Sequence, residues 1–553
     1  MIFMLFYLAV TNIIILLLKH IQSFKSNRPI MKKSLNLLQL TFASTSAIIG
    51  SGWLLGIYVS AKYAGPASIF SWFISGFAIM LIALVYSELG AMIPATGGLA
   101  RYPKYTHGAF LGFIASWILI IAGAAVSTIE TEATVQYLNF YMHDLFSGKT
   151  LTPLGLIFAF SILIFFFLLN LFGAKIFAKT NTLLTYFKIA VLIIVATALI
   201  YISVKDGNVK NITSYNLIPY GYGGIMKSIS LGGIIFSYLG FRQAIDLSGE
   251  AKNPGRDVPI ATILSVVIGM AAYTVLAFGF IISVPHVQNN SWNMLNFSSP
   301  FVNLFNLYGF PLFALIVIFG AVISPFATGL VYMGTTSRIT YAMSKMKFLP
   351  KSFHSNLNKY GTAYISLIFT FLLSALYLLP FPSWRSLVGI ITSGMVFTYI
   401  LGPVGLMAFR RLDPHRKRPF RLPFAGTVSL LAFIVGTLII YWSGFDVLWK
   451  LEVGISVGII LFLFTNFNKI KNKLKETLIP GLWFLFYMIA VLTISFLGSK
   501  NFGGKNLIES PYDLIIIVFI AVISYFIAIN SSVTREEMKM IMEEELVGEE
   551  LDA

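Results

Sequence analysis

The sequence predicts an all-α polytopic membrane protein. Hydrophobic residues make up 57% of its 553 residues, charged residues make up only 11%, and the mean hydropathy is +0.83. So few charges cannot cover a water-facing surface, which excludes a soluble globular protein. The apolar residues also occur in uninterrupted runs of about 20, which match a helix that crosses a bilayer and not the alternating strands of a barrel.

Fourteen hydrophobic spans follow one another along the chain. We expect membrane helices at 41–60, 67–93, 109–138, 153–172, 183–203, 228–247, 259–284, 311–336, 362–380, 386–409, 427–444, 447–466, 479–498 and 512–530. Before them, residues 1–34 form an N-terminal extension in which the apolar run Met1–Leu18 precedes several basic residues. This run is an additional helix, an uncleaved signal-like segment, or a stretch upstream of a start at Met31.

The distribution of basic residues predicts the orientation. If the segment before Thr41 is inside, the inner stretches hold 28 of the 39 lysines and arginines and the outer stretches hold nine, while Lys188 and Arg242 lie within spans. This asymmetry follows the positive-inside rule. We therefore expect a protein of the cell (plasma) membrane whose core N-terminus and C-terminus are cytoplasmic. The net charge of +17 is then explained by the basic residues of the inner loops, which orient the protein in the membrane, so we expect no nucleic-acid partner. The acidic tail at 531–553 is expected to be a short cytoplasmic helix or disordered.

Two spans are interrupted by residues that weaken a helix. Gly50-Ser51-Gly52 divides the span Thr41–Tyr58, and Ser-Tyr-Leu-Gly at 237–240 divides Gly232–Glu250. One interpretation is that the small residues only allow neighbouring helices to approach closely. Paired interruptions in corresponding positions of two halves, however, are typical of the binding site of a secondary transporter.

The unpaired backbone groups at these breaks predict a pocket for an α-amino acid. The N–H groups of Gly50, Ser51 and Gly52 open a half-helix and suit a carboxylate. Free carbonyls near Ala47 and Ile48, and others in the second break, suit an ammonium group. The candidates in the second break are Phe236, Ser237, Leu239 and Gly240.

Lys188 is the candidate for proton coupling. It lies in the apolar stretch Thr180–Val195, where a lysine is costly unless it is near a membrane edge, paired or deprotonated. A buried lysine of this kind can take up and release a proton during a transport cycle. The alternative is that its ammonium reaches the inner interface, since it lies only nine residues after Lys179.

Arg242 is the candidate for substrate selection. Its planar fork suits a side-chain carboxylate, which would make aspartate or glutamate the substrate. Alternatively, it pairs within the protein, with Asp246 one turn later or with Glu130 or Glu132 in the third span. In that case the substrate is neutral, and an unpaired Glu130 or Glu132 facing the pocket would favour a cationic one.

Four further polar residues are candidates for gates and for the pathway. Glu88 and Glu250 lie at inner helix ends beside basic loops, where ion pairs open and close as helices move; such charges are also often merely solvated. Ser324 and Thr328 flank Pro325 in the eighth span. They line the pathway, or they satisfy backbone groups that the proline frees.

The chain resembles the amino acid–polyamine–organocation superfamily of permeases. The resemblance rests on phrases that follow the family's order: IIGSGWLLG (Ile48–Gly56), Tyr86–Trp117, FSYLGFRQAIDLSGEAKNPGRDVPIA (Phe236–Ala261), SRITYAMSKMKFLP (Ser337–Pro350) and RPFRLP (Arg418–Pro423). The tryptophan after GSG, the GFRQ phrase and the fourteen spans resemble in particular the branch of aspartate/glutamate–proton symporters.

The resemblance implies a LeuT-type core of two inverted repeats, each with five helices. The repeats would cover 35–205 and 206–410, followed by four accessory helices at 411–530. It also implies that Phe236 is the aromatic lid over the substrate; the alternative is simple packing, but the position of Phe236 in the break favours the lid. The Lys188 ammonium would stand where sodium-coupled relatives bind a sodium ion.

We therefore expect a proton-coupled amino acid importer that works by alternating access, with its site between the broken core helices 1 and 6. An acidic amino acid and a proton are the expected partners, within a lipid bilayer. An antiporter of amino acids or polyamines, and a sensor that binds an amino acid without transport, are the alternatives. We expect no enzyme and no metal or cofactor, because the chain has no cysteine and none of its six histidines lies in a predicted span.

Overall fold

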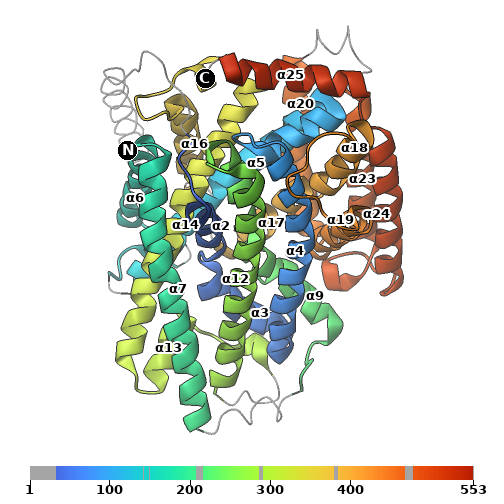
Figure 1. Cartoon of the computed structure of the whole chain (residues 1–553). Helices are drawn as coiled ribbons and strands as arrows, with labels where there is room; N and C mark the ends of the chain where they lie inside the picture. The colour runs from blue at the N-terminus through green and yellow to red at the C-terminus, as the bar shows by residue number, and fades with distance from the viewer. Residues whose placement is uncertain are drawn as a thin grey trace.

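The computed structural model describes residues 33–140, 142–148, 150–206, 216–285, 291–378, 384–466 and 477–551, which form a bundle of long helices (Figure 1). The predicted N-terminal run Met1–Leu18 and the alternative start at Met31 lie outside these residues. Within the described part of the chain, 11 helical segments are long and apolar enough to cross a membrane, or up to 12 if a bent pair counts as one span. The predicted all-α membrane fold is confirmed.

Each of the fourteen predicted spans has a helical counterpart. The first long segment, Leu37–Met92, contains both 41–60 and 67–93. The bent pair corresponds to 228–247, and a shorter apolar helix, Tyr364–Tyr377, corresponds to 362–380. The structure has eleven long segments and the sequence predicts fourteen spans, because two predicted spans lie in one segment, one span is a bent pair and one is a short helix. None of these breaks changes the apolar pattern of the sequence.

The first half of the chain contains the first break and the long helix α5. Asn36 opens α2 with a capping box, since its side chain accepts from the N–H of Gln39 at 2.9 Å and the Gln39 side chain binds back. Within α5, His107 and Gly108 leave helical geometry and make a kink. The elements are α2 (Leu37–Ile48), a π-helical turn (Gly52–Gly56), α3 (Ile57–Ala64), α4 (Ser68–Met92), α5 (Gly98–Leu138), the short hairpin β1 (Phe146–Ser147) and β2 (Thr150–Leu151), α6 (Pro153–Leu171) and α7 (Ala174–Lys205).

The second half contains the second break and the long helices α12 and α14. Both helices begin at a proline, Pro254 and Pro311, whose fixed φ suits the first helical position. α14 packs along α5, and α12 packs along α4 and α2. The elements are α9 (Gly221–Leu231), α10 (Ile234–Tyr238), α11 (Gln243–Asp246), α12 (Pro254–Ser283), α13 (Pro300–Leu307), α14 (Pro311–Lys345), α15 (Ser352–Ser355), α16 (Tyr364–Tyr377), α17 (Trp384–Tyr399) and α18 (Leu401–Leu412).

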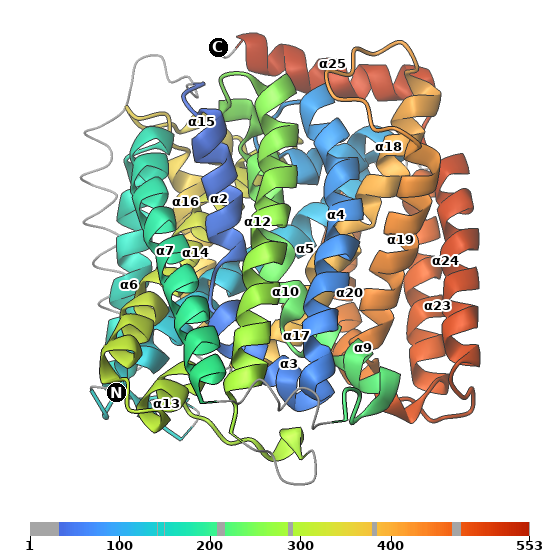
Figure 2. The ribbon, with the colours of Figure 1, turned by 60° about the horizontal axis from the view of Figure 1, so that its bottom comes forward.

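The last membrane helices lie together at one side of the bundle, and α6 and α7 lie at the opposite side (Figure 2). The acidic tail forms a helix, α25, which lies across one end of the bundle (Figure 1). It is held there by the N–H of Val533, which donates to the carbonyl of Thr106 at 2.9 Å, and by an ion pair between Lys104 and Glu545. The elements are α19 (Ala425–Trp442), α20 (Phe445–Thr465), α23 (Trp483–Leu497), α24 (Tyr512–Asn530) and α25 (Arg535–Leu551).

Candidate substrate-binding and coupling site

The two broken segments lie directly against each other. α2 ends at Ile48 and the π-helical turn begins at Gly52, so the chain leaves α-helix between them. A Cβ atom added to Gly240 would come closer than 3.0 Å to the backbone of Ala47 and Ile48, and one added to Gly52 would overlap the Ser237 side chain. These two glycines therefore permit a backbone approach that any other residue would prevent.

The second break is longer than the sequence indicates. Its first part is a 42° bend between α9 and α10 at Gly232 and Gly233, where Gly233 has a φ of 83°. A 3₁₀ turn over Leu239–Arg242 then separates α10 from α11. Ser44 of α2 is bound to this region, because its hydroxyl donates to the carbonyl of Phe241 at 3.0 Å and accepts from the N–H of Ala244 at 2.9 Å.

Lys188 reaches from α7 to the end of α2. Its Nζ lies 2.7 Å from the carbonyl of Ser46 and 2.8 Å from that of Ile49. It also lies 3.0 Å from the Ser46 hydroxyl and 2.9 Å from the Thr328 hydroxyl. The side chain is 1% exposed, so the ammonium is held inside the bundle and does not extend to an interface. It occupies the carbonyls that lose their helical partners where α2 ends.

Glu130 of α5 binds the other side of the same break. Its carboxylate accepts from the N–H of Ser51 at 2.8 Å and from the Ser51 hydroxyl at 3.0 Å. A Cβ atom added to Gly50 would lie 2.6 Å from Glu130 Oε1, so the glycine leaves room for the carboxylate. The N–H of Ser51, which the sequence predicts to hold a substrate carboxylate, thus binds a carboxylate of the protein in this structure.

Two further side chains complete the polar surroundings of the break. The Tyr273 hydroxyl of α12 donates to the carbonyl of Ile48 at 2.7 Å, and the Ser324 hydroxyl of α14 donates to that of Ile49 at 2.9 Å. The ring of Tyr273 stacks on Trp72 of α4, with ring centroids 4.5 Å apart. Four helices, α5, α7, α12 and α14, therefore bind the short segment between α2 and the π-helical turn.

Arg242 is fully buried and paired with Asp246 one turn later. Its guanidinium also lies over the ring of Tyr332, 5.6 Å from the centroid. The pair satisfies one nitrogen of the guanidinium, whereas Arg242 Nε and Arg242 Nη2 have no hydrogen-bond partner among the residues that the structure describes. Arg242 is thus paired with Asp246 and still has guanidinium nitrogens free to bind another group.

Phe236 and Leu239 lie in the second break. The Phe236 side chain is buried, at 5% exposure. The carbonyl of Leu239 accepts from the Tyr399 hydroxyl of α17 at 2.7 Å, and the Ser237 hydroxyl donates to the carbonyl of Gly233 at 2.8 Å. The Leu239 carbonyl and the Ser237 hydroxyl therefore both form hydrogen bonds within the protein.

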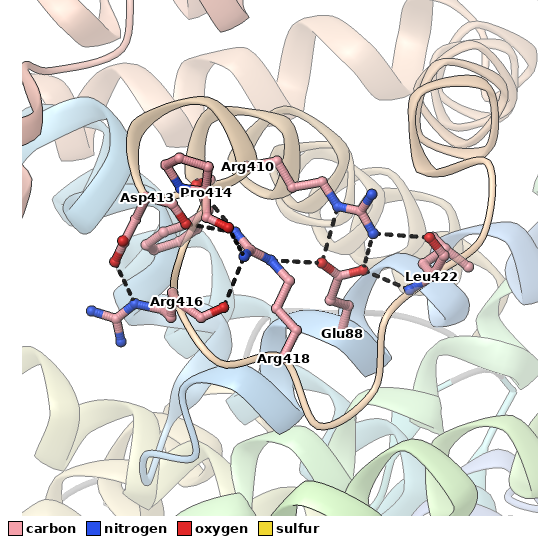
Figure 3. A network of polar contacts seen from close by, with 8 residues as sticks. Glu88, Arg410, Asp413, Pro414, Arg416, Arg418 and Leu422 are labelled. Carbon is pink, nitrogen blue, oxygen red and sulfur yellow. Dashed lines mark hydrogen bonds and ion pairs between the residues drawn. The ribbon is translucent and has the colours of Figure 1, made fainter.

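Glu88 is the centre of a network at the end of α4 (Figure 3). Its buried carboxylate binds Arg410 of α18, with Nη2 at 2.5 Å, and lies 3.2 Å from Nε of Arg418. It also accepts from the N–H of Leu422 at 2.7 Å. The network joins α4 to α18 and to the loop that follows α18.

Glu250 forms a second ion pair at the same end of the bundle. Its carboxylate binds Arg338 of α14 through two nitrogens. Its carbonyl accepts from the N–H groups of Ser34 and Leu35 at 2.9 and 3.0 Å. Glu250 thus joins the chain before α2 and the end of the second break to α14.

At the opposite end of the bundle, a cavity of about 680 Å³ is lined by residues of the π-helical turn and of α3. Glu132 lines it together with Lys62 and His143, whereas Glu130, two residues earlier, faces Ser51. The two neighbouring carboxylates of α5 therefore lie in different environments, Glu130 at the break and Glu132 in the cavity.

Sequence reasoning named most of these residues but missed several of their partners. The sequence offers Glu130 as a partner of Arg242 and not of Ser51, because a helical pattern does not tell which neighbour a buried carboxylate meets. It gives no signal for Tyr273, since one tyrosine in an apolar span is not unusual. The spacing of four residues between Arg242 and Asp246 does indicate their pairing.

Comparison with known proteins identifies the family of this chain. Residues 35–465 match the model of a family described as amino acid permease. The chain is 33% identical over 517 residues to the glutamate/serine transporter AimA of Bacillus subtilis (strain 168), covering 92% of this chain and 96% of that protein. It is 35% identical over 504 residues to the aspartate-proton symporter of the same organism, covering 90% and 96%. The methylthioribose transporter of that organism is 25% identical over 469 residues, 82% of this chain and 97% of that protein. The chain therefore belongs to the amino acid permease family and is a multi-pass membrane transport protein, not an enzyme.

Proposed function

We propose that the protein imports an acidic amino acid together with protons, by alternating access at the two breaks. The observation that carries this proposal is the position of the Lys188 ammonium on the carbonyls of Ser46 and Ile49. A titratable side chain at this position links the protonation of Lys188 to the geometry of the first break. The names of two relatives, an aspartate-proton symporter and a glutamate/serine transporter, support the same proposal.

The proposed coupling follows from the hydrogen bonds of Lys188. A charged ammonium donates three hydrogen bonds, and here it joins α7 to the end of α2 and to Thr328 of α14. Loss of the proton removes one donor and the charge, and so weakens the bonds between these helices. Protonation from one side and release to the other would then favour two different positions of α2 against α7 and α14.

The proposed substrate site uses the same break. The N–H groups after Ile48 bind the α-carboxylate, which takes the place of Glu130 on Ser51. The substrate ammonium binds carbonyls of the second break near Phe236, Ser237 and Leu239, and Phe236 covers the bound molecule. The free nitrogens of Arg242 and the side-chain amide of Gln243 bind the side-chain carboxylate of the substrate. A carboxylate fits here because it accepts hydrogen bonds from the guanidinium N–H groups that have no partner.

The proposed movement involves the two ion-pair networks at the end of the bundle predicted to be cytoplasmic. Glu88 with Arg410 and Arg418, and Glu250 with Arg338, join elements that alternating access would separate. In this proposal the repeats 35–205 and 206–410 form the moving core, 411–530 supports it, and the protein lies in the cell membrane.

The test is uptake of a panel of labelled amino acids into proteoliposomes, with and without an imposed inward proton gradient. The proposal expects aspartate or glutamate to accumulate only with the gradient. Uptake that needs a counter-substrate inside and no gradient would instead indicate an antiporter. Binding without any uptake would indicate a sensor.

A further inference from the structure

A positively charged cavity lies at the first turn of α7. It has a volume of about 520 Å³ and is bounded by the start of α7, the end of α14 and the segment before α16. Lys175, Lys179, Arg338 and Lys359 line it, and the one acidic side chain among its described lining residues is Glu250, which is already paired with Arg338. The cavity therefore carries a net positive charge.

Two lysines give the cavity unsatisfied positive charge. Lys175 and Lys179 lie one turn apart on the same face of α7, and both are exposed. Neither makes a hydrogen bond or an ion pair with another described residue. Because α7 begins at Ala174, the N–H groups of its first turn add positive potential at the same place. An anion is the ligand that these groups fit.

The surroundings of the cavity indicate that the anion is part of a lipid. α6 and α7 lie at the outer edge of the bundle in both views (Figure 1, Figure 2). Phe172 and Ile176 line the cavity and are each 42% exposed. Leu183 and Tyr186 continue this exposed apolar surface along α7. An acyl chain would lie on this surface while its phosphate lies at the lysines, as in basic pockets that hold anionic headgroups on the cytoplasmic side of a membrane.

We propose that this cavity is a binding site for the phosphate headgroup of an anionic phospholipid of the cytoplasmic leaflet, such as phosphatidylglycerol. Arg338 lies on its wall, so the headgroup would contact the ion pair with Glu250 that joins α14 to the second break. The proposal concerns lipid binding and does not rest on the transport function proposed above.

The test measures the melting temperature of the purified full chain in detergent during titration with short-chain phosphatidylglycerol. Short-chain phosphatidylcholine, glycerol 3-phosphate and aspartate are titrated in parallel. The variant is Lys175→Gln with Lys179→Gln, and Lys179→Gln alone serves if the double variant does not fold. The matched control is Lys351→Gln with Lys417→Gln, two exposed lysines of other loops at the same end of the bundle.

Phosphatidylglycerol is expected to raise the melting temperature of the wild type and of the control in a saturable way. Each lysine near a membrane surface contributes about fivefold to the affinity for anionic lipid, so half-saturation of the double variant needs roughly 25-fold more lipid. An equal response of the double variant, or an equal effect of phosphatidylcholine, would overturn the proposal. A shift by glycerol 3-phosphate as large as that by the lipid would show a site for free anions, and a lysine-dependent shift by aspartate would show a substrate exit; either result also overturns it.

Discussion

Lys188 and Glu130 place opposite charges on the two sides of one break. The ammonium of Lys188 binds the carbonyls where α2 ends, and the carboxylate of Glu130 binds Ser51 where the next half-helix begins. A zwitterionic amino acid carries the same two groups. In the proposed site, Glu130 occupies the N–H of Ser51 that would bind the substrate carboxylate, so it would have to release Ser51 before that carboxylate binds.

This exchange predicts the behaviour of Glu130→Gln. A protonated carboxyl or an amide at position 130 accepts the hydrogen bonds of Ser51 more weakly than a carboxylate does. The substrate then displaces it more easily, which corresponds to about tenfold in substrate affinity. Substrate affinity of the wild type should therefore rise as the pH falls, and Glu130→Gln should bind with an affinity that depends less on pH. Titration calorimetry at several pH values measures this, with Glu132→Gln as the control on the same helix. An unchanged pH dependence in Glu130→Gln would contradict the exchange.

Arg242→Lys tests the selection of an acidic substrate. Lysine retains the charge and can still pair with Asp246, but it lacks the planar fork whose nitrogens are unsatisfied. We expect the affinity for aspartate to fall by about tenfold to a hundredfold relative to asparagine, because the remaining partner groups are left unpaired. Competition binding with the two amino acids gives the ratio. If Arg242 acts only as the partner of Asp246, both affinities fall equally and the ratio stays the same.

At this scale the sequence predicts unusual residues better than their partners. Lys188 stands out because a lysine within an apolar stretch is rare, and the structure shows it at the break. Glu130 and Glu132 cannot be distinguished in the sequence, yet Glu130 faces Ser51 and Glu132 lines the cavity of about 680 Å³ at the opposite end of the bundle from Glu88. The side of a helix on which a charge meets its partner depends on tertiary packing, which no local pattern encodes.

At the scale of elements, the breaks in α2–α3 and α9–α11 form one unit. Gly240 lies against the backbone of Ala47 and Ile48, and Gly52 lies against the Ser237 side chain. The glycines thus have a steric role in addition to weakening the helices. Their presence in the sequence predicts the breaks, but the mutual contact could be predicted only because paired interruptions of this kind are typical of secondary transporters.

The two glycines should respond differently to a compensating change. Gly240→Ala and Gly52→Ala each overpack the contact and should lower stability by about 1–3 kcal/mol. Adding Ser237→Gly should restore part of the loss in Gly52→Ala, because it removes the atoms that the new methyl group meets. It should not help Gly240→Ala, whose methyl group meets backbone. Melting temperatures of the purified variants decide this; equal rescue of both would show that the breaks pack in another way.

At the scale of the whole molecule, hydropathy predicts the helices but not the connections between them. All fourteen apolar spans are helical because the bilayer requires internal backbone hydrogen bonding of any apolar run that crosses it. The partners of Glu88 are Arg410 and Arg418, more than 300 residues later in the chain. Such pairs depend on which helices meet at one end of the bundle.

The proposed alternating access with proton coupling concerns the whole molecule. In the proposed cycle Lys188 joins α7, α2 and α14, so its charge affects the positions of all three helices. A variant that cannot take up a proton should still bind substrate but should not use a proton gradient to concentrate it. The comparison needs a variant of similar volume and a control lysine on the same helix.

The most direct test is accumulation of aspartate in proteoliposomes under an imposed inward proton gradient, comparing the wild type with Lys188→Met and with Lys205→Met at the other end of α7. We expect the wild type and Lys205→Met to accumulate aspartate only with the gradient. Lys188→Met should bind aspartate and equilibrate it at most to equal concentrations on the two sides. Gradient-driven accumulation by Lys188→Met at the wild-type level would contradict the assignment of Lys188 as the coupling residue.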